Sequence, residues 1–236
     1  MQDGFVKVAA ITPEVRVADV AFNVNACVEA ARRACTEDGA MVVVLPELCL
    51  TAYTCEDLFW QDALLAAAER GLADFAQATS DLNALLLVGL PVRVNAKLYN
   101  CAAVVSAGAV LGVVPKRYLP TYNEFYEGRH FVPGTTDVVP IDIAGQLDVP
   151  FGINQLFTCE DMPELVVATE LCEDLWVPEP PSIAHAKAGA TLICNLSASN
   201  AIVGKADYRR SLVSGQSACL ICGYVYASAG AGESTQ

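Results

Sequence analysis

Positive charge is scarce in this sequence of 236 residues. It has 14 Lys and Arg against 27 Asp and Glu, which gives a formal net charge of −13. Binding to nucleic acid and to anionic membrane surfaces depends on Lys and Arg, so we expect neither as a partner. A small solute or another protein is the partner that this composition favours.

Long hydrophobic runs are also missing, although apolar residues make up 54% of the chain and charged residues only 17%. This balance excludes a disordered protein, and no window approaches the roughly 20 apolar residues of a membrane span. The first 15 residues have neither the basic start nor the apolar stretch of a secretory signal peptide. With ten cysteines, these features predict a cytoplasmic protein with free, mostly buried thiols.

Motifs for metals and phosphates are absent as well. Cys219 and Cys222 form a C-x-x-C pair, but no second pair exists, and only His130 and His185 could add nitrogen ligands. We therefore expect no metal site, and we interpret the two thiols as core residues at the end of a helix. No GxxxxGK[ST] motif is present, so we expect no cofactor in this chain.

Strand-like and helix-like segments alternate along the chain. Residues 40–47 and 165–172 are short apolar runs, typical of strands buried on both faces. A helical period runs over 61–81, and Asp19 is a candidate cap for a helix over 18–39. We see no linker or repeat, so we predict a single α/β layered domain over residues 1–236. The remaining expected strands are 6–13, 83–95, 98–116 (as two strands), 191–200 and 224–229, and the remaining expected helices are 180–190 and 207–222.

Three of these strands end in residues that could carry chemistry: Glu47, Lys116 and Cys172. Open α/β sheets gather their ligands at the carboxyl ends of the strands, so we expect the three side chains to meet. A carboxylate can take the proton of a thiol, and a lysine can stabilise an oxyanion. Lys116 would also offset the acids that follow the cysteine, Glu173 and Asp174. Each residue taken alone has another interpretation: Cys172 could be a packed thiol, and Glu47 and Lys116 could be solvated residues at the start of loops.

Longer segments resemble one family. LPELCLTAY (45–53), VPKRYLPTYNEFYE (114–127), TELCEDLWVPEPPS (169–182) and NLSASN (195–200) occur in the order found in the amidase domain of glutamine-dependent NAD synthetases. That domain belongs to the nitrilase superfamily, and the resemblance runs from about Phe5 to the last residue. It implies a nitrilase-like αββα sandwich, which we expect to lack closing strands at its C-terminal end.

The resemblance also implies roles for individual residues. Cys172 would be the nucleophile that forms a glutamyl thioester, Glu47 the general base, and Lys116 the cation that stabilises the oxyanion. Glu127 matches a second glutamate that supports the site. The positions that match the glutamine pocket are Tyr53, Tyr122, Phe125, Glu173, Trp176 and Ser199, of which Glu173 would accept the substrate ammonium.

The family carries a second domain, which adenylates nicotinic acid adenine dinucleotide with ATP and accepts the ammonia. Its Ser-Gly-Gly-rich loop is not found in this sequence, so we expect ATP and Mg²⁺ only in that domain. Glutamine, the synthetase domain and further copies of the chain in a homo-oligomer are the expected partners, and we expect slow turnover from the chain alone. Two alternatives stay open: a free-standing amidase for another amide, and a catalytically silent assembly domain.

Overall fold

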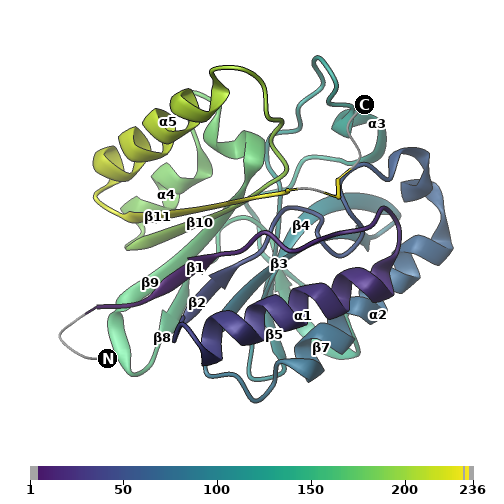
Figure 1. The fold of residues 1–236 in the computed structure, drawn as a ribbon, viewed down its shortest axis with the longest axis horizontal. Helices are drawn as coiled ribbons and strands as arrows, with labels where there is room; N and C mark the ends of the chain where they lie inside the picture. The colour runs from purple at the N-terminus through teal and green to yellow at the C-terminus, as the bar shows by residue number, and fades with distance from the viewer. Residues whose placement is uncertain (1–4, 231, 234–236) are drawn as a thin grey trace.

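Two β-sheets lie face to face at the centre of the molecule (Figure 1). The computed structural model describes residues 5–230 and 232–233. The larger sheet has the order β1-β2-β3-β4-β5-β7-β6 and the smaller one β11-β10-β9-β8. The strands of the larger sheet are β1 (Val8–Ala10), β2 (Val42–Val44), β3 (Leu85–Val94), β4 (Lys97–Ser106), β5 (Ala109–Pro115), β6 (Val139–Ile143) and β7 (Gln146–Phe151). Those of the smaller sheet are β8 (Phe157–Cys159), β9 (Met162–Leu171), β10 (Leu192–Ser197) and β11 (Gly223–Ser228).

Helices cover the outer face of each sheet (Figure 1). α1 (Val20–Thr36) and α2 (Asp62–Ala78) pack on the larger sheet, whereas α4 (Pro181–Lys187) and α5 (Lys205–Leu220) lie over the smaller one. The order of layers is therefore helix, sheet, sheet, helix, as the family resemblance implied. The short helices are η1 (Glu56–Trp60), α3 (Glu127–His130) and η2 (Cys172–Leu175).

Apolar side chains from both sheets fill the space between them. Val44 and Val104 of the larger sheet belong to one buried cluster with Leu171 and Leu196 of the smaller sheet. A strand between this cluster and the outer helices is buried on both faces, which is why β2 consists of valines only. The interpretation of 40–47 as a buried strand is confirmed for its centre, Val42–Val44, whereas the flanking residues lie outside the strand and Met41 is half-buried.

The N-terminus of α1 is also where the sequence places it. Asp19 is the N-cap, and its side chain accepts a hydrogen bond of 3.2 Å from the Phe22 N–H. This contact satisfies one of the free N–H groups at the start of a helix. The expected elements are otherwise recovered with ends that differ by a few residues.

The hairpin of β6 and β7, and strand β8, were not anticipated. Most residues of β6 and β7 are exposed or half-buried, and each of the two strands contains a proline. No apolar run marks them, so their pairing depends on neighbours that the local sequence does not reveal.

The interpretation of the C-x-x-C pair as core is wrong for one of its members. All ten cysteines are free, and most are buried, but Cys219 is exposed on α5. α5 contains no buried residue, although it lies over the smaller sheet (Figure 1). Cys222 is buried as expected and donates to the Ala190 carbonyl. Within the described part of the chain, no helix is long and apolar enough to cross a membrane.

Candidate active site

Both sheets contribute to the candidate site. β2 leads through Pro46 to Glu47, β5 leads to Lys116, and both strands belong to the larger sheet and run in the same direction. Cys172 follows β9 of the smaller sheet and begins η2. The predicted residues thus meet across the interface between two sheets, rather than at the edge of one open sheet as we expected.

Lys116 forms two ion pairs where water does not reach. Its Nζ lies 2.6 Å from Oε1 of Glu47 and 2.5 Å from Oε1 of Glu127. The exposed fractions are 1% for Lys116, 0% for Glu47 and 3% for Glu127. Such charges are stable in an interior only when they are paired and hydrogen-bonded. The pairing therefore ties the two glutamates and the lysine into one unit.

Neighbouring groups satisfy the remaining carboxylate oxygens. The Asn100 amide donates to Glu47 at 2.8 Å and to Glu127 at 3.2 Å, and the Tyr53 hydroxyl donates to Glu127 at 2.7 Å. The Ala198 N–H donates to the second oxygen of Glu47 at 2.9 Å. Sequence reasoning missed Asn100, although a buried asparagine within the apolar strand β4 is a signal in itself.

The ion pairs keep the lysine charged. Burial works against its ammonium group, but the carboxylates of Glu127 and Glu47 outweigh burial and raise the pKa of Lys116 well above its usual value. Burial raises the pKa of Glu127, and the Lys116 charge acts in the opposite direction. A fixed positive charge therefore acts on the thiol of Cys172.

Cys172 has an unusual backbone conformation. Its φ is 40°, in the left-handed region that residues other than glycine rarely adopt. Its N–H donates to Oδ1 of Asn195 at 3.1 Å, and Oγ of Ser197 donates to its Sγ at 3.2 Å. Strained backbone of this kind persists where surrounding contacts hold it, and it concentrates at active sites.

The surroundings of the Cys172 thiol favour its protonated form. Burial, followed by the charge of Glu47, raises its pKa to about 12, whereas Lys116 and the Ser197 hydrogen bond lower it. Lys116 is thus a positive partner of the thiol, as expected. The main opposition to the thiolate comes from burial and Glu47, not from the adjacent Glu173.

Two buried acids, Asp174 and Glu170, stabilise the turn at Cys172 through hydrogen bonds. Asp174 accepts from the Leu171 N–H at 3.0 Å and from the Tyr118 N–H at 2.8 Å, which joins the turn to the segment after Lys116. Glu170 accepts from the Tyr224 hydroxyl at 2.5 Å and from the Ser182 N–H at 2.8 Å.

A chain of hydrogen bonds connects Glu170 to the cysteine backbone. The Asn195 amide donates to the Tyr224 hydroxyl at 3.2 Å, and the same asparagine accepts from Cys172. Because the Cys172 N–H can only donate, the side-chain oxygen of Asn195 faces Cys172 and its amino group faces Tyr224.

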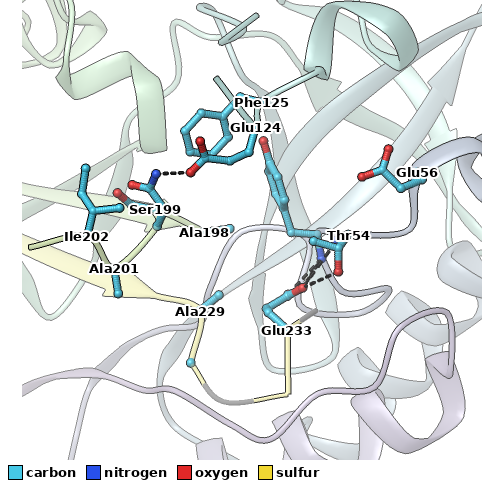
Figure 2. A pocket seen from close by; sticks show the side chains of 13 residues that line it. Thr54, Glu56, Glu124, Phe125, Ala198, Ser199, Ala201, Ile202, Ala229 and Glu233 are labelled. Carbon is cyan, nitrogen blue, oxygen red and sulfur yellow. Dashed lines mark hydrogen bonds between the residues drawn. The ribbon is translucent and has the colours of Figure 1, made fainter. Parts of the chain in front are cut away.

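A cavity of about 550 Å³ is lined in part by Tyr53 and Ala198, which hydrogen-bond to Glu127 and Glu47. Figure 2 shows it with Phe125 above, Ser199 and Ile202 on one side, and Thr54 on the other. Of the predicted pocket residues, Tyr53, Phe125 and Ser199 line it. The other lining residues are Thr54, Glu56, Glu124, Ala198, Asn200, Ala201, Ile202, Ala229, Gly230 and Glu233.

The other predicted pocket residues form a second group. The Tyr122 hydroxyl donates to the Glu173 carboxylate at 2.9 Å. The nitrogen of Lys205 lies 5.0 Å from the ring centre of Trp176 and 5.8 Å from that of Phe125. Sequence reasoning missed Lys205, which places a cation between two predicted pocket rings. Across residues 5–230 and 232–233, no group of three His, Cys, Asp or Glu side chains could hold a metal ion.

Comparison with known sequences gives consistent matches. Residues 7–233 match the family described as "Carbon-nitrogen hydrolase". The chain is 48% identical over 234 residues to the glutamine-dependent NAD(+) synthetase of Mycobacterium tuberculosis, a match that covers 99% of this chain and 34% of that protein. The chain thus spans about a third of the length of the curated relatives it matches.

Solved structures agree on the fold. A glutamine-dependent NAD(+) synthetase from Cytophaga hutchinsonii superposes with a TM-score of 0.84 at 29% identity, covering 95% of this chain and 36% of that one. An amidase of the nitrilase superfamily from Nesterenkonia, at 21% identity, superposes with a TM-score of 0.73 over 97% of this chain and 78% of that one. The fold is therefore that of the nitrilase superfamily, and the chain belongs to the carbon-nitrogen hydrolase family.

Proposed function

We propose that this chain hydrolyses the side-chain amide of glutamine through a covalent thioester on Cys172. The observation that carries the proposal is the buried unit of Lys116, Glu47 and Glu127 next to a cysteine in a left-handed turn. It combines a base and a cation with a nucleophile, which is what covalent acyl transfer needs. The choice of glutamine rests on relatives that are named glutamine-dependent.

In the first half of the reaction, Glu47 takes the proton of the Cys172 thiol and the sulfur attacks the amide carbon. The oxyanion of the tetrahedral intermediate is stabilised by the Lys116 ammonium. Glu47 then gives its proton to the departing nitrogen, so that ammonia leaves and a thioester remains.

In the second half, a water molecule gives a proton to Glu47 and attacks the thioester. Collapse of this intermediate releases glutamate, and the proton returns from Glu47 to the sulfur of Cys172. All proton transfers use one carboxylate, which the contacts from Lys116, Asn100 and Ala198 hold in place. Glu127 takes no proton in this scheme and instead holds the lysine.

The ends of a free amino acid need charged partners. We assign the substrate ammonium to the Glu173 carboxylate, which Tyr122 orients. Lys205, between the rings of Phe125 and Trp176, supplies a cation for the substrate carboxylate, with Ser199 on the cavity wall as a further donor.

The curated relatives are about three times as long as this chain. We therefore propose that residues 1–236 form the glutaminase domain of a longer protein, in which the ammonia passes to an ATP-dependent synthetase domain that makes NAD. In this scheme, ATP and Mg²⁺ bind to that domain, and the protein acts as a homo-oligomer in the cytoplasm.

The test is mass spectrometry of the intact protein after exposure to an electrophilic glutamine analogue, followed by peptide mapping. We expect one adduct, on Cys172, which excess glutamine prevents, and the other nine of the ten cysteines serve as internal controls. The Glu173→Gln variant should need more glutamine for the same protection.

Two outcomes would contradict the proposal. Labelling of Cys172 that glutamine does not slow would indicate a different amide substrate. A folded chain that takes no adduct would instead support the silent assembly domain.

A further inference from the structure

Ser197 contacts the reacting sulfur but has no part in the reaction described above. It is the last residue of β10, it is 0% exposed, and its Oγ lies 3.2 Å from Sγ of Cys172. Two other groups meet the same hydroxyl. The Ser199 nitrogen lies 3.2 Å from Oγ, and the phenolic oxygen of Tyr226 lies 2.5 Å from it.

The number of hydrogen bonds available to this hydroxyl limits how it can be arranged. A serine hydroxyl has one proton to donate and two lone pairs. The Ser199 N–H can only donate, so it occupies one lone pair. When Tyr226 donates to the other lone pair, the sulfur of Cys172 is the acceptor left for the Ser197 proton.

The hydroxyl groups of Ser197 and Tyr226 can also form hydrogen bonds with the protonated cysteine. In that state the S–H donates to Ser197, and Ser197 donates to Tyr226. The Ser197 hydroxyl therefore has one saturated arrangement for the thiol and another for the thiolate, and rotation of the Ser197 and Tyr226 O–H bonds exchanges them. No heavy atom needs to move, which keeps the cost of reorganisation low.

We propose that Ser197 is a catalytic residue that stabilises the Cys172 thiolate by donating a hydrogen bond, and that Tyr226 is a positioning residue that directs this proton to the sulfur. The inference rests on the proposed function and adds a donor to it. The thiol proton still goes to Glu47. Ser197 keeps its own proton and forms no covalent bond.

The site needs such a donor because burial and Glu47 both disfavour the thiolate. The titratable groups that face Cys172 are Glu47, Lys116, Glu127, Tyr53, Tyr122, Lys205 and Tyr226. Two of these groups are cations: Lys116, which lowers the pKa of the thiol but is shared with two carboxylates, and Lys205, which also interacts with Cys172. Ser197 is the neutral donor in direct contact with the sulfur.

The test is the rate at which iodoacetamide alkylates Cys172, followed by peptide mapping across the neutral and alkaline pH range. This reaction reads the thiolate directly and requires neither glutamine nor turnover. In Ser197→Ala, we expect the rate at a given pH to fall about tenfold, as for the loss of one hydrogen bond to a charged group. The pH profile should shift upward by about one unit.

Tyr226 is tested in the same assay. Tyr226→Phe should shift the profile in the same direction by a smaller amount. The double variant should react no more slowly than Ser197→Ala, because Tyr226 acts only through Ser197. A double variant that reacts more slowly than Ser197→Ala would contradict the role assigned to Tyr226.

A matched control removes a buried hydroxyl that does not touch the sulfur. Thr169 on β9 is 1% exposed and donates to the Cys194 carbonyl at 2.9 Å. Thr169→Val should keep the wild-type profile. An unchanged profile in a folded Ser197→Ala variant, or an equal shift in Thr169→Val, would overturn the proposal.

The two proposals can fail separately. If glutamine does not protect the wild-type protein, the proposed substrate is wrong, whereas the alkylation profiles still report on Ser197. If glutamine protects and the profiles do not shift, the glutaminase stands and Ser197 has only a packing role. If Ser197→Ala does not fold, the pH profile of Cys172 alkylation in Tyr226→Phe tests the proposal. A Tyr226→Phe profile equal to that of the wild type would overturn it.

Discussion

Lys116 lies between two carboxylates in a part of the protein that water does not reach. Desolvation of three charges is costly, and their mutual attraction offsets that cost only while all three are present. The lysine therefore matters for stability as well as for the proposed chemistry, and the two effects can be separated by substitution.

We expect Lys116→Met to lower the free energy of unfolding by about 3–5 kcal/mol, because two buried carboxylates lose their cation. Urea unfolding followed by circular dichroism measures this change. As a control, Lys97→Met removes an exposed lysine at the start of β4 and should change stability by less than about 0.5 kcal/mol.

A neutral version of the cluster distinguishes stability from catalysis. The triple variant Glu47→Gln, Lys116→Met, Glu127→Gln buries no charge, so it should regain most of the lost stability. Because it lacks the base and the cation, this triple variant should nevertheless take no adduct from the glutamine analogue. A single Lys116→Met variant as stable as the wild type would show that the ion pairs do not carry the stability we assign to them.

At the scale of elements, β3 makes room for the segment that carries Glu47. A Cβ atom on Gly89 of β3 would lie 2.3 Å from the Leu48 nitrogen and 2.5 Å from the Pro46 carbonyl oxygen. Real atoms do not approach so closely, so only glycine lets the main chain on either side of Glu47 pass against this strand.

We therefore expect Gly89→Ala to push this segment away from β3 and to lower the free energy of unfolding by about 1–3 kcal/mol, as overpacked interiors do. Displacement of Glu47 should also slow the labelling of Cys172 by the glutamine analogue. Urea unfolding and mass spectrometry measure the two effects.

The matched control is Gly215→Ala on α5, where an added Cβ atom would meet nothing within 4 Å. Alanine in a helix should increase stability by about 0.5–1 kcal/mol. Equal effects at positions 89 and 215 would refute the role that we give to β3.

At the scale of the whole molecule, the two sheets and their outer helices account for the burial of the core, but α5 stays exposed on its outer side. Large apolar residues near its two ends are also exposed: Ile202, Val203, Tyr208 and Ile221. Ile202, Val203 and Tyr208 lie around the N-terminal end of α5, and exposed apolar residues that are close together are typical of surfaces that bind other proteins.

Together with the family resemblance, this exposure leads us to predict that the 25.0 kDa chain self-associates. Copies with a net charge of −13 repel one another, so association should strengthen as salt screens that repulsion. Light scattering at several salt concentrations measures the mass. A strict monomer under all of these conditions would contradict the prediction.

Sequence patterns alone predicted most of the elements. Apolar runs revealed the buried strands, since a strand between two layers has no polar face, and helical periods revealed α1 and α2. They also predicted that Glu47, Lys116 and Cys172 would meet, because each follows such a strand. The resemblance to a known family added Glu127 and the pocket residues, whose roles stay predictions.

Other features were decided by tertiary structure alone. Ser197 and Asn195 are ordinary residues of a buried strand until β9 brings Cys172 beside them, and Asn100 becomes part of the site only when Lys116 draws two carboxylates to it. The sequence by itself determined the main strands and helices and the reactive groups, because apolar periodicity and residue type are local properties. The state of the cysteine was decided by the fold, because burial, charge and hydrogen bonds at one sulfur come from segments far apart in the chain.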